Sequence, residues 1–366
     1  MRIGIVSKWF NRGQPVVGRY LRSAFDELGH ETFVLARPKK ERGPRPGALD
    51  RDDVWDQPRI TEASAFEVPL AEYERWVEDN TIDVVFCDQN YQFAELAELR
   101  RRGVRVLGRF VWEHFAEEHV AGALDAYDLV YSMTRAEQER YRGWGLETPY
   151  VPWGCHPELL SIEPHRDPDV VTCLYPGGFI GHRKPVGDVV EAFTRTSDER
   201  LRLLVTAQVD RRLDEVVEVA ADDPRIELRL EDLPRMEYLQ RFADCDACLA
   251  ISRWEGLGLP LHEAIAFGMP VITNDVPPMN EPIEDGRNGL LVRSHPDGHA
   301  KSGITAYRPD VDDLAAAIER IAGAELRERL SQGARAVRSE RSWSRTVEGM
   351  DGLLRQIEGV PSVVAE

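Results

Sequence analysis

The sequence has little that would anchor the chain in a membrane or cross-link it. No run of about 18 apolar residues occurs along the 366 residues, so we expect no membrane-spanning helix. The opening segment MRIGIVSKWF reads as a strand followed by a loop, without the long apolar core of a signal peptide. Five cysteines, an odd number scattered over the chain, are typical of a reduced intracellular protein. We therefore expect a cytoplasmic location.

The few cysteines also do not form a convincing metal site. Cys245 and Cys248 make a C-x-x-C pair, but no second Cys or His pair follows at zinc spacing. Asp244 and Asp246 flank Cys245 in a D-x-D pattern, yet this triplet stands at a predicted helix-to-strand junction rather than after a strand. We expect packing roles for the cysteines, no bound metal and no cofactor.

Positive charge is scarce, which argues against one class of partner. The formal net charge is −18, so phosphate backbones would repel the chain and we do not expect a nucleic-acid partner. Residues 1–50 are an exception, because they hold ten Lys or Arg against five Asp or Glu. Such a segment can face an anionic acceptor or an acidic membrane surface. A solvated loop over residues 37–45 explains it equally well.

Hydrophobic and charged residues, at 42% and 30%, are present in the proportions of a folded chain. Short β-branched runs alternate with amphipathic segments of helix length, and a long loop is predicted over residues 37–68. The ten predicted strands lie at residues 3–7, 32–36, 82–86, 104–108, 128–132, 170–175, 201–206, 226–230, 247–252 and 270–273. This alternation predicts α/β architecture with parallel sheets covered on both faces. Ten strands are too many for one unit, so we expect two doubly wound, Rossmann-like domains facing a cleft.

Two acids flank a glycine turn in the stretch SRWEGLGLPLHEAIAFGMPVI. Glu255 lies in a loop after a strand, and Glu263 lies in the first turns of the helix that Pro260 begins, so both can face one pocket. Gly256 and Gly258 allow the backbone to approach a ligand closely, and the helix start offers unpaired N–H groups to phosphate or hydroxyl oxygens. A macrodipole preference for Glu near a helix start, with an ordinary glycine turn, explains the same residues without a ligand.

A second stretch, YPGGFIGHRKPVGDVVEAF, places glycines and a basic cluster between a strand and a helix. This order is typical of loops that cradle phosphate. The candidates are Gly178, His182, Arg183 and Lys184. A solvated turn explains the basic cluster equally simply.

The first of these stretches resembles a known family motif. EGLGLPLHEAIAFGMPV resembles the E-x7-E motif of the retaining glycosyltransferases of family 4, whose usual form is EGFGLxxxEAMAxGxPV. The segments LGHETFVL, VPWGCHPELL, NEPIEDGRNGLLV and SWSRTVEGMDGLL resemble other family segments in the same order along most of the chain. The resemblance implies the GT-B fold, with an acceptor-side domain at 1–152, a donor-side domain at 153–340 and a helix at 341–358 that crosses back.

The resemblance also implies roles for residues of the second domain. Glu263 would bind the ribose hydroxyls of the nucleotide. Glu255 would lie against the donor sugar, together with the backbone N–H groups of Gly256, Leu257 and Gly258. In the other stretch Lys184 matches the diphosphate-binding lysine of the family, and Gly178 belongs to the same loop. The partner arginine of that lysine falls on Phe179, and Arg183 or His182 is expected to supply the missing charge.

The first domain departs further from the family pattern. Gly13 stands where the family commonly has paired glycines near the donor phosphates, and an ordinary turn explains it as well. The family histidine at the end of the fourth main strand has no clean counterpart. Glu113 and His114 are the catalytic candidates there, beside Glu255, Lys184 and Arg183 in the second domain. A histidine near an apolar stretch is also a common packing residue.

The resemblance thus implies a retaining, metal-independent glycosyltransferase with a front-face mechanism. Its donor would be a nucleoside-diphosphate sugar, UDP- or GDP-linked, and its acceptor is not identified. Two other functions stay open: a GT-B sugar-nucleotide epimerase, and a non-catalytic auxiliary protein that binds sugar nucleotides.

Overall fold

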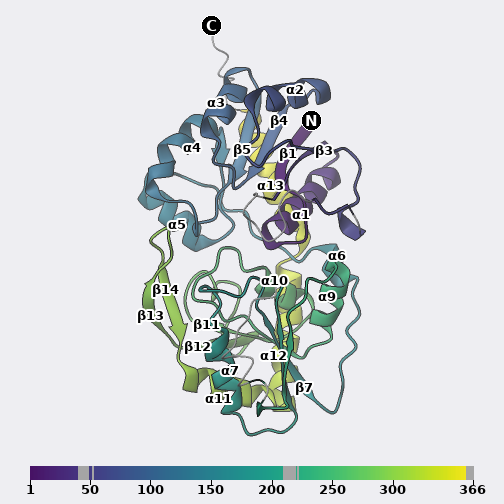
Figure 1. Ribbon diagram of the computed structural model, residues 1–366, viewed down its shortest axis with the longest axis vertical. Coiled ribbons are helices and arrows are strands. Elements are labelled where there is room, and N and C mark those ends of the chain that lie inside the picture. The colour runs from purple at the N-terminus through teal and green to yellow at the C-terminus, as the bar shows by residue number, and fades with distance from the viewer. Residues whose placement is uncertain (40–48, 52, 209–219, 221, 360–366) are drawn as a thin grey trace. The chain divides into compact units, whose positions relative to one another are not determined.

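The computed structural model describes residues 1–39, 49–51, 53–208, 220 and 222–359 (Figure 1). The chain divides into two compact units. The first unit consists of Met1–Pro152 and the chain from Ser344 onward, and the second consists of Trp153–Trp343. The chain therefore passes from one unit to the other twice, at residues 152–153 and 343–344.

The first unit is built on a parallel six-stranded sheet. Its strand order is β3-β2-β1-β4-β5-β6. The strands are β1 (Arg2–Lys8), β2 (Glu31–Arg37), β3 (Ile60–Glu62), β4 (Val84–Asp88), β5 (Arg105–Arg109) and β6 (Leu129–Val130). The helices are α1 (Gly13–Glu27), η1 (Asp53–Trp55), α2 (Leu70–Asn80), α3 (Phe93–Arg101), η2 (Glu117–His119), α4 (Val120–Ala126), α5 (Arg135–Gly143) and α13 (Trp343–Glu358). The central strands are buried along their length, as expected of a parallel sheet with both faces covered.

The second unit repeats this plan and adds a hairpin. Its parallel sheet has the order β12-β11-β10-β7-β8-β9. The strands are β7 (Val171–Pro176), β8 (Leu201–Thr206), β9 (Ile226–Arg229), β10 (Ala247–Leu249), β11 (Val271–Asn274), β12 (Gly289–Val292) and the hairpin strands β13 (Ser294–His299) and β14 (Thr305–Pro309). The helices are α6 (Pro157–Leu160), α7 (Val186–Thr194), α9 (Arg235–Ala243), α10 (Leu259–Ala266), α11 (Val311–Ile321) and α12 (Ala324–Glu340).

The core of the second unit lies on both faces of its sheet. Successive strand residues point to opposite faces. Tyr175 packs with Phe193 of α7 and Ile318 of α11 on one face, whereas Leu174 packs with Phe242 of α9 on the other. Helices α7 and α11 lie side by side in Figure 1. The predicted parallel, two-sided architecture is thus confirmed for this unit.

All ten predicted strands occur, and within the described residues four further strands accompany them. These are β3, β12 and the two strands of the hairpin. The long loop predicted over residues 37–68 contains η1 and the short strand β3, while residues 40–48 and 52 lie outside the described residues. The C-terminal helix predicted at 341–358 begins at Trp343.

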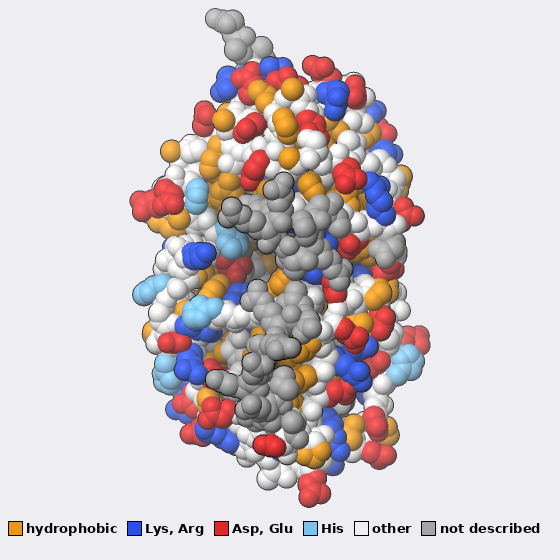
Figure 2. All heavy atoms as spheres, viewed as in Figure 1, with side chains coloured by type: hydrophobic (Ala, Val, Ile, Leu, Met, Phe, Trp, Pro, Cys, Tyr) orange, Lys and Arg blue, Asp and Glu red, His pale blue; other side chains and the backbone are white. Residues whose placement is uncertain are grey.

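The basic segment at residues 1–50 does not form one exposed surface in the part that the structure describes. Four of its arginines are buried: Arg12, Arg19, Arg22 and Arg37. Burial lowers the pKa of Arg22. Acidic and basic side chains are interspersed over the face of the molecule shown in Figure 2. The interpretation of this segment as a surface for anionic partners therefore gains no support from these four residues.

Two smaller predictions can also be checked. All five cysteines are buried and none forms a disulfide among the described residues. Burial raises the pKa of Cys245 to about 12. The Asp244–Asp246 triplet lies between α9 and β10, the junction at which it was predicted. Among the described helices, none is long and apolar enough to cross a membrane.

Candidate active site

The main predicted site residues of the second unit lie in the loops that follow two neighbouring strands. Strands β7 and β10 pair in parallel, so the loops that follow them leave the same edge of the sheet. The loop after β7 carries Arg183 and Lys184 and leads into α7. The loop after β10 carries Ser252 and Glu255 and leads into α10. The topology thus brings a basic loop and an acidic loop together.

One carboxylate oxygen joins the two loops. Glu255 Oε1 accepts from Lys184 Nζ at 2.7 Å and from Ser252 Oγ at 2.8 Å, and it lies 2.5 Å from Arg183 Nη1. Lys184 Nζ also donates to Ser252 Oγ at 2.5 Å. Lys184 and Glu255 are both buried, whereas the Arg183 side chain is 30% exposed. Arg183, not His182, is the second cation beside Glu255.

The electrostatics of this cluster favour an anion. Burial alone would raise the pKa of Glu255, but Arg183 and Lys184 outweigh it and lower that pKa to about 2. Burial lowers the pKa of Lys184, and Glu255 offsets part of this effect. Two cations around one carboxylate leave a net positive charge. An ammonium has three N–H donors, and two are directed at Ser252 and Glu255, so one remains for a ligand oxygen.

The glycine turn before α10 brings the backbone of Gly258 close to the side chain of Leu261. Gly258 is the N-cap of α10 and has φ of 73°, a left-handed conformation that favours glycine. A Cβ at this position would lie 2.7 Å from Leu261 Cδ1. Pro260 stands in the first turn as predicted, and the N-cap Gly258 has no side chain that could cap the helix. The first N–H groups of α10 therefore remain suited to oxygen atoms of a ligand.

The second acid of the motif has partners that the sequence did not reveal. Glu263 is 3% exposed, and its Oε1 accepts from Arg235 Nη2 at 2.6 Å. Its Oε2 lies 3.4 Å from the hydroxyl of Tyr238. Both partners come from α9. Glu158 Oε1, near the start of α6, lies 3.9 Å from Arg235 Nε. Glu263 thus stands apart from the Glu255 cluster in a separate charged pair.

Other predicted residues of the basic loop take different roles. Gly178 has φ of 54°, and its carbonyl accepts from Gln208 N at 2.9 Å. Phe179 is one of the exposed large hydrophobic residues. His182 contacts the guanidinium of Arg253 rather than Glu255. The expectation that His182 replaces the cation lost at Phe179 is therefore not supported by these contacts.

The candidates in the first unit lie at the carboxyl edge of its own sheet. Gly13 is the exposed first residue of α1. Glu113 and His114 lie in the turn after β5. The sequence missed the buried pair at this edge, in which Arg109 Nε donates to Asp88 Oδ1 at 2.8 Å. Asp88 ends β4 and Arg109 ends β5, so charge is concentrated at the strand ends.

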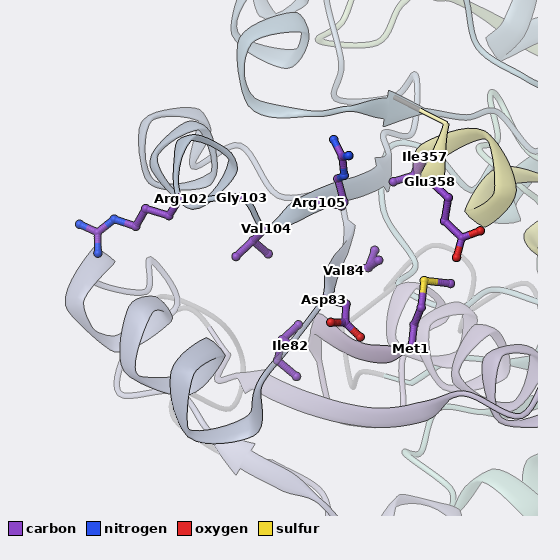
Figure 3. Close-up of a pocket in the computed structure, with 10 residues that line it drawn as sticks. All are labelled: Met1, Ile82, Asp83, Val84, Arg102, Gly103, Val104, Arg105, Ile357 and Glu358. Atoms are coloured by element: carbon purple, nitrogen blue, oxygen red, sulfur yellow. The ribbon is translucent and has the colours of Figure 1, made fainter. Parts of the chain in front are cut away.

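A pocket of the first unit does not coincide with these residues (Figure 3). Its volume is about 450 Å³, and its lining includes Met1, Asp83, Val104, Arg105 and Glu358. Met1 precedes β1, and the lining residues Val84 and Arg105 are the first residues of β4 and β5. Ligands of parallel α/β sheets bind at the carboxyl ends. We therefore base no site on this pocket.

Comparison with known proteins connects the geometry to a family. Residues 171–323, which include both loops, match the family model described as "Glycosyl transferases group 1". The second unit carries a glycosyltransferase group 1 domain. This domain contains every candidate of the second unit, from Gly178 to Glu263.

One curated relative extends the similarity beyond this domain. A lipopolysaccharide 1,6-galactosyltransferase from Salmonella typhimurium is 24% identical over 273 residues, which cover 70% of each protein. The first two curated relatives are matched over only 14% and 16% of their own lengths. The similarity to the galactosyltransferase thus agrees with the group 1 match of residues 171–323.

Solved structures show the fold. A sucrose-phosphate synthase from Thermosynechococcus elongatus superposes with a TM-score of 0.75 at 18% identity, covering 98% of this chain and 99% of that one. HepE from Anabaena, solved in complex with UDP-glucose, gives a TM-score of 0.71 at 14% identity, covering 97% and 100%. The predicted GT-B fold with two Rossmann-like domains is therefore confirmed.

Proposed function

We propose that the chain is a retaining glycosyltransferase of family 4. It would transfer a sugar from a UDP- or GDP-linked donor to an acceptor that is not identified, without a metal ion. The observation that carries this proposal is the Lys184–Glu255–Arg183 cluster beside the start of α10, inside the group 1 domain. The EGLGLPLHE segment, which resembles the E-x7-E motif, supplies Glu255 of the cluster and the start of α10.

The cluster suits a departing diphosphate. A nucleoside diphosphate leaves with additional negative charge on its terminal phosphate, and preorganised cations stabilise that charge most where water is excluded. Lys184 retains one N–H for a phosphate oxygen, and Arg183 is partly exposed. Glu255 holds both cations in place and orients the sugar with the backbone of residues 256–258. In this proposal the protein replaces the metal ion with fixed positive groups.

The reaction that we propose proceeds on one face of the sugar. The bond from the anomeric carbon to the leaving phosphate oxygen breaks, and a bond to the acceptor oxygen forms on the same face. The acceptor proton passes to the leaving phosphate, so no protein nucleophile is required and the anomeric configuration is retained. Lys184 and Arg183 offset the charge that develops on the phosphate before it takes the proton.

The second acid would bind the nucleoside. Two ribose hydroxyls can donate to one carboxylate, and the Glu263 carboxylate is fixed in position by its hydrogen bond from Arg235. HepE, a structural neighbour, was solved with UDP and with UDP-glucose. The pneumococcal O-GlcNAc transferase GtfA, another neighbour, was solved with UDP and GlcNAc. We therefore expect uridine nucleotides to bind with higher affinity than guanosine nucleotides in a screen of both.

The test is a binding titration followed by an assay with acceptors. We expect UDP or GDP to bind the parent protein and Lys184→Met to weaken that binding by about tenfold or more, since a charge-assisted hydrogen bond is lost. Lys301→Met, on the exposed hairpin turn, is the matched control. Equal affinity of the Lys184→Met variant and the parent would refute the diphosphate assignment.

Product analysis separates the proposed activity from its two alternatives. A glycosyltransferase consumes the sugar nucleotide only when an acceptor is present and forms a product of retained configuration. Conversion of the donor without an acceptor would indicate an epimerase. Binding without turnover across an acceptor panel would indicate an auxiliary protein.

A further inference from the structure

The β13–β14 hairpin stands outside the parallel sheet of the second unit. Within the described residues its strands form a two-stranded antiparallel sheet of their own, and they follow the edge strand β12 (Figure 1). Every residue of β13 is exposed or half-buried, whereas β14 buries Ala306 and Pro309. Strand β13 therefore contributes little to the core, and its polar contacts explain its place in the fold.

The hairpin is joined to the two loops of the candidate site through the backbone of Arg253. The N–H of Arg253 donates to the carbonyl of Arg183 at 2.9 Å. The carbonyl of Arg253 accepts from the N–H of Tyr307, in β14, at 2.8 Å. Arg253 is two residues before Glu255. Backbone hydrogen bonds therefore connect three segments in space, with the acidic loop between the basic loop and the hairpin.

The side chain of Arg253 repeats this connection. Its Nη2 lies 2.7 Å from Asp297 Oδ2 and also donates to the Asp297 carbonyl, both in β13. Its Nη1 lies 2.5 Å from His182 Nε2 and 3.3 Å from the His182 carbonyl. A guanidinium only donates, so the ring nitrogen of His182 accepts. The Arg253 side chain is 9% exposed, so these contacts are made by a buried guanidinium.

A second ion pair fixes the other hairpin strand. Arg308 of β14 donates through Nε to Asp188 Oδ2 at 3.0 Å, and its Nη2 contacts Asp188 Oδ1. Asp188 is buried in the first turn of α7, directly after the basic loop. The hairpin thus contacts the second half of the basic loop at His182 and the first turn of α7, directly after the loop, at Asp188.

We infer that the β13–β14 hairpin is a clamp for the candidate site and that Arg253 is a positioning residue within it. The basic loop contains Gly177, Gly178 and Gly181, and such a loop costs conformational entropy when a ligand orders it. The clamp supplies that order before the ligand arrives, so Arg183 and Lys184 are presented in one geometry. The effect on ligand binding rests on the function proposed above, whereas the effect on loop order does not.

Hydrogen exchange measures the clamp without any ligand. Asp297→Ala removes the carboxylate that holds Arg253 but leaves the backbone of β13 intact. We expect the amides of Arg253 and Tyr307 to exchange about tenfold faster in this variant, the factor that corresponds to one lost hydrogen bond to a charged group. Asp312→Ala is the control, because Asp312 pairs with Arg195 instead. Equal exchange in the parent and Asp297→Ala would overturn the inference.

Ligand binding distinguishes a positioning role from a general loss of structure. Asp297→Ala should weaken binding of the nucleoside diphosphate about tenfold and leave binding of the free nucleoside unchanged, because the clamp orders only the phosphate loop. Asp297→Glu, which keeps a carboxylate, should restore the affinity. An equal loss for nucleoside and diphosphate would refute the positioning role.

Failure of the clamp and failure of the proposed function give different results. If the parent binds no nucleoside diphosphate, the proposed function fails while the exchange result still decides the clamp. If the parent binds one and Lys184→Met weakens it, but Asp297→Ala changes neither exchange nor affinity, the clamp alone is refuted.

Discussion

Replacing Glu255 with glutamine tests the electrostatic account of the site without any substrate. Glutamine keeps the shape of the side chain and its contact with Ser252 but removes the negative charge. Lys184 then remains buried beside Arg183, a second cation, with no carboxylate between them. We expect Glu255→Gln to destabilise the folded protein strongly, although the substitution removes hardly any packing.

The structure provides the magnitude. The pKa of Glu255 is about 2 in the fold against an ordinary 4.5. At about 1.4 kcal/mol per pKa unit, this difference corresponds to about 3 kcal/mol of stability at neutral pH. Removing one partner of a buried ion pair typically costs about 3–5 kcal/mol, and the partial exposure of Arg183 favours the lower end. For a unit of this size, about 3 kcal/mol lowers the unfolding midpoint by about 6–12 °C.

Thermal unfolding of five proteins checks this reasoning: the parent, Glu255→Gln, Lys184→Met, the double variant and a control. The double variant Glu255→Gln with Lys184→Met should be more stable than Glu255→Gln alone, because it no longer buries the Lys184 ammonium without its carboxylate partner. Glu237→Gln is the control, since Glu237 is 54% exposed and its pair with Arg241 is worth at most about 0.5 kcal/mol. The account is refuted if Glu255→Gln lies within about 1 kcal/mol of the parent, or if the two substitutions destabilise additively.

Three further predictions follow from the same geometry. Because folding lowers the pKa of Glu255, its contribution to stability is present above pH 4.5 and is lost as the pH falls towards about 2; urea unfolding across this range should show a loss in the parent that Glu255→Gln lacks. Gly258→Ala should cost about 1–2 kcal/mol because of its φ of 73°, whereas Gly143→Ala in α5 should stabilise by about 0.5–1 kcal/mol in the same thermal scan. Arg235→Met should weaken nucleoside binding about tenfold by leaving Glu263 without its cation, and an unchanged Kd in a titration would contradict this.

The predictable part of the site is local in sequence. Pro260 and Gly258 mark the start of α10 through their own backbone preferences, and the position of Glu255 follows from the strand that precedes it. Arg235 could not be found in this way, because 28 residues separate it from Glu263. Its place depends on how α9 and α10 pack on the same face of the sheet. Such a partner is a property of tertiary packing rather than of any short pattern.

The hairpin was missed for a different physical reason. A strand is recognised by the alternation of buried and exposed residues, and this requires a face that packs on a core. The β13 segment SHPDGH has no buried residue, contains proline and glycine, and so lacks that alternation. Its structure comes from polar contacts through Asp297 and the partner strand.

The buried pair Asp88–Arg109 could not be predicted from a sequence pattern, because its two residues lie on different strands. Arginine at the end of a strand is ordinarily read as the first exposed residue, and the resemblance to the family indicated Glu113 and His114 in the following turn instead. The register of β4 and β5 places Asp88 directly beside Arg109. Burial lowers the pKa of Arg109, but the Asp88 carboxylate outweighs this and raises it above its ordinary value, so the guanidinium stays charged inside the unit. A register shifted by one residue would move one partner to the opposite face of the sheet, and the pair would be lost. Strand pairing, rather than strand identity, therefore determines which charges the edge of this sheet can hold.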